Sequence, residues 1–190
     1  NINSNSPMES RVEVVSKSEK VIDEMQKEIR GIAFNLMPQT LIQFGLVPAL
    51  KEMALRITSS GQVMVTVISF DVPERLSEVL EISLYRIIQE WVNNVLKYAE
   101  ALKIEVQIVG HEKELCITIE DTGKGFDTNV LKQGSGNGWR NIMSRVKLVH
   151  GELEIDSYPN RKGTTLIIRV PHEDALEEQK TQTEGLKNTQ

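Results

Sequence analysis

The chain has 190 residues, of which 39% are hydrophobic and 26% charged, so it has the composition of a globular protein with room for one domain and an appendage. The formal net charge is −5, and Lys and Arg do not cluster, which argues against a nucleic-acid-binding surface. No apolar run approaches the ~18–20 residues that cross a membrane, so we expect no membrane contact. The single cysteine, Cys116, cannot form an internal disulfide and favours a reducing, cytoplasmic compartment.

The N-terminal part carries a long amphipathic pattern. Residues 1–7 look like a linker or a remnant of a longer chain. Over residues 8–37 apolar side chains recur at spacings of three, four and seven among charges of both signs, which predicts a helix that ends before Pro38. A lone helix cannot bury such a stripe within itself. It therefore either packs on its own domain or pairs with a second copy in a dimeric bundle.

The central body, residues 40–172, predicts an α+β fold with two layers. Alternating apolar and β-branched residues indicate strands at 62–70, 103–109, 114–120, 153–157 and 164–170. Longer apolar periodicity indicates helices at 46–57, at 77–98 and from 139 onward. We expect three helices on one face of a mixed, mostly antiparallel sheet of about five strands. The polar tail, residues 173–190, has few large apolar side chains, and we expect it to be disordered or a linker.

The helix predicted at 77–98 has one polar stripe of interest. Glu90, Asn94 and Lys97 are spaced i, i+4 and i+7, so they share a face opposite the apolar arc. Such a stripe is most simply a solvated surface. Its composition also suits a metal–phosphate site, because an amide oxygen is a ligand that Mg²⁺ accepts, a carboxylate orients metal-bound water, and a lysine meets phosphate as a point charge.

Two glycines and an acidic residue follow the third predicted strand, in EDTGKGFD. Asp121 stands at the strand end, where its carboxylate could accept a hydrogen bond from an exocyclic amine such as that of adenine. Gly123 and Gly125 would let a flat ring approach the backbone, or adopt positive φ. A plain turn explains the same string, so the motif alone does not decide.

Two further glycine-containing segments occur downstream. GSGNG, which contains Gly136 and Gly138, stands just before a predicted helix, where backbone amides could hold phosphate. A flexible connector is the simpler explanation. Gly163 and Thr164 open the last predicted strand, where the Thr164 hydroxyl could share a water with Asp121, or the pair could simply start the strand.

The order of these four motifs resembles the nucleotide-binding domain shared by histidine kinases, DNA gyrase, heat-shock chaperones and mismatch-repair ATPases. YRIIQEWVNNVLKYAEA resembles the N-box of that superfamily, IEDTGKGFD and GSGNGWRNIMSRV resemble its two glycine boxes, and RKGTTLIIRVP resembles its terminal Gly-Thr strand. The resemblance implies a Bergerat-type ATPase fold that binds ATP and Mg²⁺. It implies that Asn94 ligates Mg²⁺, that Glu90 and Lys97 support the metal and the phosphates, and that Asp121 with Thr164 reads adenine. Gly123, Gly125, Gly136 and Gly138 would shape the pocket and its lid.

The N-terminal segment narrows the resemblance. EIRGIAFNLMPQTLIQFGLVPAL is similar to the junction between the second bundle helix and the ATPase domain in sensor histidine kinases paired with helix-turn-helix response regulators. That similarity implies a homodimer through residues 8–37, and transfer of the γ-phosphate of ATP to a histidine and then to an aspartate of the receiver domain of a response regulator. The chain departs from the pattern because its histidines, His111, His150 and His172, all lie outside the N-terminal helix, so we expect no autophosphorylation.

Two aromatic residues also depart from the family pattern. Tyr98 stands where the family often has histidine, and Trp139 where leucine is usual, both close to the expected phosphate and lid region. Two alternatives to a histidine kinase stay open, and these aromatic residues bear on the second of them. One is another ATPase or a serine kinase of the same superfamily. The other is a non-catalytic interaction module that dimerises through its long helix.

Overall fold

The computed structural model describes residues 38–171, apart from 62, 133–136 and 160. The helix expected at 8–37 and the tail expected at 173–190 lie outside these residues, as does Gly136, so the division of the chain into segments stays a prediction. The described elements are α2 (Gln39–Phe44), α3 (Leu46–Ser59), β1 (Met64–Phe70), α4 (Glu78–Tyr98), β2 (Lys103–Gly110), β3 (Glu114–Asp121), α5 (Asn129–Lys132), α6 (Asn137–Leu148), β4 (Glu152–Asp156) and β5 (Thr164–Pro171).

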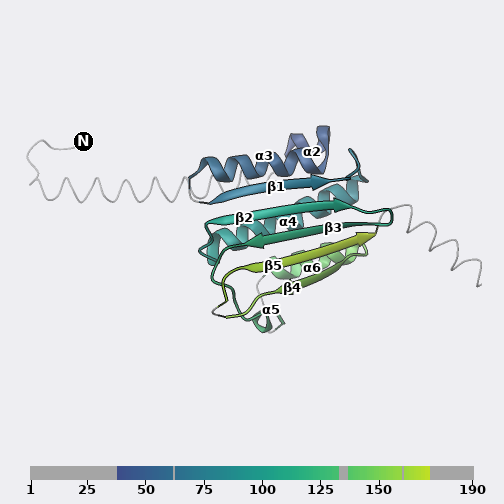
Figure 1. Cartoon of the computed structure of the whole chain (residues 1–190). Coiled ribbons are helices and arrows are strands. Elements are labelled where there is room, and N and C mark those ends of the chain that lie inside the picture. Colours follow the sequence, from purple (N-terminus) through teal and green to yellow (C-terminus); the bar gives the residue numbers. More distant parts are fainter. Residues whose placement is uncertain (1–37, 62, 133–136, 160, 172–190) are drawn as a thin grey trace, which may run out of the picture. The chain divides into compact units, whose positions relative to one another are not determined.

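These strands form one mixed sheet in the order β1-β2-β3-β5-β4 (Figure 1). β1 pairs with β2 in parallel, and the other three pairings are antiparallel. The prediction of a mixed, mostly antiparallel sheet of about five strands is confirmed. Its α+β architecture is confirmed as well, because α4 and α6 lie together behind the sheet in Figure 1.

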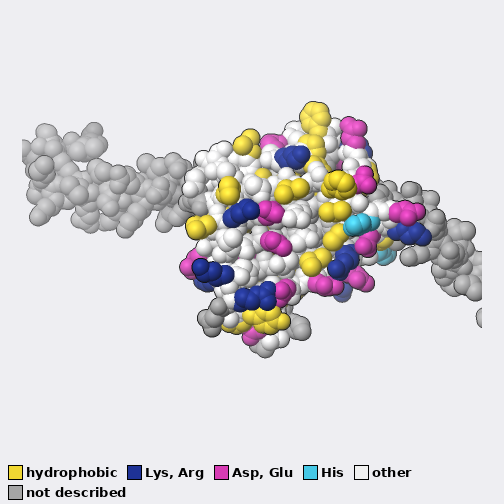
Figure 2. All heavy atoms as spheres, in the orientation of Figure 1, with side chains coloured by type: hydrophobic (Ala, Val, Ile, Leu, Met, Phe, Trp, Pro, Cys, Tyr) yellow, Lys and Arg dark blue, Asp and Glu magenta, His cyan; other side chains and the backbone are white. Residues whose placement is uncertain are grey.

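The two faces of the sheet differ as the alternation of the strands predicts. Side chains on the face toward α4 and α6 are fully buried, among them Ile104, Ile117, Leu166 and Ile168. The opposite face carries charged side chains of both signs and scattered apolar ones, and Figure 2 shows this face. Register explains the division, because directly paired residues such as Ile117 and Ile168 point to the same side of the sheet.

Helix α4 is the longest described helix and matches the prediction for 77–98. The side chain of Ser77, its N-cap, accepts a hydrogen bond from the backbone N–H of Leu80 at 3.4 Å. The apolar arc that includes Leu84, Ile87 and Ile88 is completely buried, so the helix is fixed on the sheet by its own amphipathic pattern. Two short helices were not predicted, α2 with 6 residues and α5 with 4, because neither is long enough to show a helical period.

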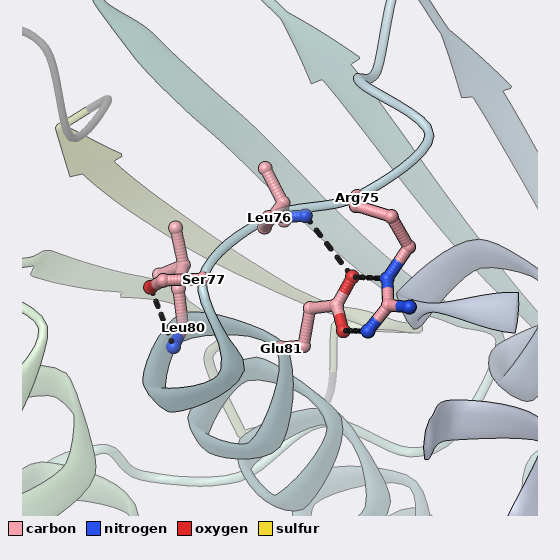
Figure 3. Close-up of polar contacts among 5 residues, drawn as sticks. All are labelled: Arg75, Leu76, Ser77, Leu80 and Glu81. Carbon is pink, nitrogen blue, oxygen red and sulfur yellow. Dashed lines mark hydrogen bonds and ion pairs between the residues drawn. The ribbon is translucent and has the colours of Figure 1, made fainter. Parts of the chain in front are cut away.

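A buried carboxylate fixes the start of α4 (Figure 3). Glu81 is 3% exposed, and it accepts hydrogen bonds from the Arg75 guanidinium at 3.1 and 3.0 Å and from the Leu76 backbone N–H at 3.0 Å. A Cβ on Gly45, whose φ is +82°, would lie 2.9 Å from Glu81 Oε1. The turn between α2 and α3 and the loop between β1 and α4 therefore meet at this one side chain. This contact holds the N-terminal end of α4 in position relative to β1.

Candidate nucleotide-binding site

A cavity of about 670 Å³ opens between the C-terminal half of α4, the adjoining ends of β3 and β5, and the start of α6. Its volume is in the range of small-molecule and cofactor sites. Seven of the nine predicted site residues line it, namely Glu90, Asn94, Lys97, Asp121, Gly125, Gly138 and Thr164. Gly123 does not line the cavity but donates its backbone N–H to the Asp121 side chain, and Gly136 lies outside the described residues. The fold thus brings together residues that lie far apart in the sequence, with Glu90 and Thr164 separated by 74 positions.

One end of the cavity is built around the carboxylate of Asp121. This residue is the last of β3, pairs directly with Thr164 of β5, and is 7% exposed. Its Oδ1 accepts a hydrogen bond from the Gly123 backbone N–H at 2.6 Å. Burial raises the pKa of Asp121 above its ordinary value of 3.8, while hydrogen bonds from Gly123 and Thr164 partly counter that rise. A buried carboxylate at a cavity wall is a strong acceptor for an amine donor on a ligand.

A second hydroxyl supports this end and was not predicted. Ser157 Oγ lies 2.9 Å from Thr164 Oγ1, both residues are buried, and Ser157 also accepts a hydrogen bond from the Phe126 backbone N–H at 3.0 Å. Ser157 therefore connects the loop after β3 to the start of β5. In the sequence, Ser157 could be recognised only as the last residue of the fourth predicted strand. That position does not reveal a hydrogen-bond partner 7 residues away in a different strand.

The glycines of EDTGKGFD are required by close approach of other backbone segments. A Cβ on Gly123 would lie 2.5 Å from the Ala99 carbonyl oxygen and 2.7 Å from Asp121 Oδ1. Gly125 has φ of +68°, and a Cβ there would lie 2.5 Å from the Tyr158 carbonyl oxygen. All three distances are far below ordinary contact, so the missing side chains let the end of α4 and the turn after β4 reach the rim of the cavity.

The other end of the cavity is formed where α4 meets α6. A Cβ on Gly138, the second residue of α6, would collide with Glu90 Oε1 and would lie 3.8 Å from Asn94 Nδ2. Glu90 and Asn94 are partly covered, whereas Lys97 is exposed at the rim. The stripe is therefore more than a solvated face, because the start of α6 covers two of its three members. A carboxylate and an amide side by side supply oxygen donors that fit Mg²⁺.

The aromatic residues Trp91, Tyr98 and Trp139 also line the cavity. Tyr98 is 68% exposed, so it stands at the mouth, whereas Trp91 is 5% exposed and belongs equally to the core. Trp91 lies in the apolar arc of α4, so its helical phase alone indicates a core residue. Beside the mouth, Lys124 forms an exposed ion pair with Glu100 at 2.8 Å. Neither His111 nor His150, the histidines among the described residues, lines the cavity.

Comparison with known proteins identifies relatives of this chain. Residues 79–174 match the family described as histidine kinase-, DNA gyrase B- and HSP90-like ATPase. The chain is 34% identical over 152 residues to the signal transduction histidine-protein kinase/phosphatase DegS of Brevibacillus brevis, covering 80% of this chain and 39% of that protein. It is 28% identical over 153 residues to the oxygen sensor histidine kinase NreB of Staphylococcus carnosus strain TM300, covering 80% and 44%. The chain therefore spans less than half the length of either relative.

Solved structures share the fold. The histidine kinase domain of the blue-light activated kinase of Erythrobacter litoralis EL346 superposes with a TM-score of 0.53 at 20% identity, covering 68% of this chain and 60% of that one. The histidine kinase AdeS of Acinetobacter baumannii gives a TM-score of 0.54 at 12% identity, covering 88% and 87%. Among the residues described here, no helix is both long and apolar enough to cross a membrane.

Proposed function

Because the chain belongs to the histidine kinase-, DNA gyrase B- and HSP90-like ATPase family, we propose that its cavity holds ATP with Mg²⁺ as the catalytic site of a longer sensor histidine kinase. The family match and the two kinase relatives confirm the resemblance indicated by the four motifs, and they give the chain an ATP-binding domain of the sensor-histidine-kinase type. The single observation that carries the site assignment is the buried carboxylate of Asp121 at one end of the cavity, opposite Glu90 and Asn94 at the other.

The Asp121 end would hold the adenine. Its carboxylate accepts a hydrogen bond from the exocyclic amine of the base, and the Thr164 hydroxyl, held by Ser157, supports a water beside it. Gly123 and Gly125 let the end of α4 and the turn after β4 pack closely against the loop that carries Asp121, which shapes this end of the cavity. Guanine carries a carbonyl oxygen where adenine carries its amine, so the same carboxylate repels it. This end therefore selects adenine nucleotides.

The end formed by α4 and α6 would hold the phosphates. Asn94 would ligate Mg²⁺, Glu90 would orient a metal-bound water, and Lys97 at the rim would attract the phosphates as a positive charge. Gly138 and Gly136 would keep the start of α6 close to the phosphates, as glycines at a helix N-terminus do. When bound, Mg²⁺ neutralises phosphate charge. Phosphoryl transfer asks little of the protein beyond such positioning and charge neutralisation.

The activity of the longer protein is the further part of this proposal. The γ-phosphate would pass to a histidine and then to an aspartate in the receiver domain of a response regulator, in the cytoplasm. Residues 8–37 would serve as the second helix of a dimeric bundle. This chain has no histidine in that segment, so we expect it to bind ATP without phosphorylating itself.

The dependence of ATP affinity on Mg²⁺ tests the phosphate end. We would titrate ATP by calorimetry with and without Mg²⁺ into the unmodified chain, Asn94→Ala and Asn93→Ala. Asn93 is the matched control, since it is the adjacent amide on α4 and does not line the cavity. Mg²⁺ should strengthen ATP binding in the unmodified chain and in Asn93→Ala, but not in Asn94→Ala. Equal Mg²⁺ dependence in all three proteins would remove Asn94 from the metal site.

A further inference from the structure

The positive charges around the cavity are unevenly placed between its two ends. Among the described residues that line it, the cations are Lys97 and Lys124. Lys124 belongs to the loop after β3 and is paired with Glu100. Lys97 lies at the rim, about 10 Å along the axis of α4 from Glu90 at ~1.5 Å per residue. A triphosphate keeps a net negative charge after one Mg²⁺ binds, so the end beside Glu90 requires a further cation.

Arg140, in the first turn of α6, holds a guanidinium beside that end. Its Nη2 donates to Oδ1 of Asn137 at 2.5 Å, and Asn137 lines the cavity. The guanidinium is therefore turned back over the start of α6, in the direction in which helical side chains lean. The residue after Asn137 is Gly138, which approaches Glu90. Arg140 and Asn137 are both exposed, so a ligand in the cavity mouth can reach the guanidinium.

No described carboxylate neutralises the charge of Arg140. Ion pairs with Asp or Glu are formed by Arg56, Arg75, Arg161 and Arg169. Arg140 is held instead by the neutral amide of its neighbour on the helix. A guanidinium with an amide partner keeps its charge, and most of its five N–H donors, for an anion.

We propose that Arg140 is a further phosphate-binding residue, whose guanidinium donates to oxygens of the phosphate chain of ATP. This inference rests on the proposed function, because it takes the cavity to be the ATP site. Asn137 acts as a positioning residue that keeps the long side chain near the cavity. The planar guanidinium can bind two phosphate oxygens at once, which a lysine cannot do, so Arg140 adds orientation as well as charge.

Protection of Arg140 from phenylglyoxal, a reagent for accessible guanidinium groups, tests the proposal in the unsubstituted chain. Arg145 is the internal control, because it lies on the same helix, donates to the Asn141 backbone carbonyl at 3.2 Å and does not line the cavity. Mass spectrometry of proteolytic peptides follows the two residues separately.

The expected protection follows from mass action. With Mg²⁺ and ATP at about ten times its Kd, about a tenth of the chain is unoccupied, so modification of Arg140 should slow by about tenfold. Modification of Arg145 should not change. Adenosine, added to the same occupancy as judged by competition with ATP, should protect neither residue. An unprotected Arg140 in the ATP-saturated chain, or equal protection by adenosine, would overturn the inference.

Affinities measured by calorimetry separate this role from a purely structural one. We expect Arg140→Gln to raise the Kd for ATP by about tenfold or more, with the Kd for adenosine unchanged within about twofold. Arg140→Lys, which keeps the charge without the planar fork, should recover part of the loss. Arg145→Gln should change neither affinity. Equal ATP affinities in Arg140→Gln and Arg145→Gln would count against the proposal.

The two proposals fail in different ways. If the folded, unsubstituted chain binds no ATP, the proposed function is wrong and the role of Arg140 falls with it. If the chain binds ATP while Arg140 stays as reactive as before, only the role of Arg140 is wrong. Loss of folding in Arg140→Gln would not affect the protection test, since that test uses the natural residue.

Discussion

Gly125 and Gly61 form a matched pair that tests whether backbone approach shapes the cavity. Both have positive φ, +68° at Gly125 and +79° at Gly61. A Cβ at Gly61 meets nothing within 4 Å, whereas one at Gly125 would collide with the carbonyl oxygens of Tyr158 and Arg161. Alanine therefore introduces similar backbone strain at both positions. Only at Gly125 does it also displace a second backbone segment.

The expected magnitudes follow from these contacts. Positive φ costs a residue with a Cβ about 1–2 kcal/mol, and the reduced freedom of the unfolded chain offsets about 0.4–1 kcal/mol of that cost. We expect Gly61→Ala to lower the free energy of unfolding by about 1 kcal/mol. Gly125→Ala should lower it by at least about 2 kcal/mol, because two peptide carbonyls cannot yield as a flexible side chain does. Since the displaced turn carries Ser157, the Kd for ATP should also rise by about tenfold or more.

Urea unfolding and calorimetric titration with ATP measure the two effects separately. Gly61→Ala should bind ATP within about twofold of the unmodified chain, a difference worth less than about 0.5 kcal/mol. Equal losses of stability in the two variants, together with equal ATP affinities, would refute the argument. In that case the close approach of the turn after β4 would not determine the shape of the cavity.

Substitutions at three further positions test the site and its support. Burial raises the pKa of Asp121 above 3.8, so the ionised carboxylate lowers the stability of the folded chain at neutral pH, and this loss disappears in acid. Asp121→Asn should therefore unfold at pH 7 at a temperature equal to or higher than that of the unmodified chain. ATP affinity should fall as pH falls through this raised pKa, an effect absent in Asp121→Asn. Gly138→Ala should displace the flexible Glu90 side chain, changing stability by less than about 0.5 kcal/mol while weakening Mg²⁺–ATP binding. Glu81→Gln should cost about 1–3 kcal/mol by urea unfolding, against little change in the exposed control Glu78→Gln.

Each of these substitutions also has a result that would contradict the prediction. A variant Asp121→Asn that loses stability at pH 7 would mean that the carboxylate has favourable partners when ionised. Unchanged Mg²⁺–ATP affinity in Gly138→Ala would separate Glu90 from the phosphate end. Equal effects of the substitutions at Glu81 and Glu78 would mean that the contact with Arg75 does not hold the start of α4.

The elements predicted most accurately are those with long periodic patterns. Helix α4 could be predicted from its helical apolar periodicity and the strands from their alternation. Both patterns can be read from neighbouring residues in the sequence alone. The parallel pairing of β1 with β2 does not follow from them, since alternation looks the same in either direction. Helices α2 and α5 were missed because each is shorter than two turns.

The site was predictable where its motifs are contiguous and not where it depends on tertiary contacts. Asp121 and the adjoining glycines could be recognised because strand, acid and glycines follow one another. Ser157 could not, since its hydrogen bond to Thr164 exists only when β4 and β5 pair. Trp91 looked like core from its helical phase, and only the folded structure shows that the same residue also reaches the cavity.

The central claim is that Asp121 selects adenine in this cavity. We would measure it first by calorimetric titration of the folded chain and of Asp121→Asn with ATP and with GTP, in the presence of Mg²⁺. We expect saturable ATP binding, much weaker GTP binding, and a loss of ATP affinity of about tenfold or more in Asp121→Asn. Equal affinities for ATP and GTP, or undiminished ATP binding in Asp121→Asn, would contradict that claim.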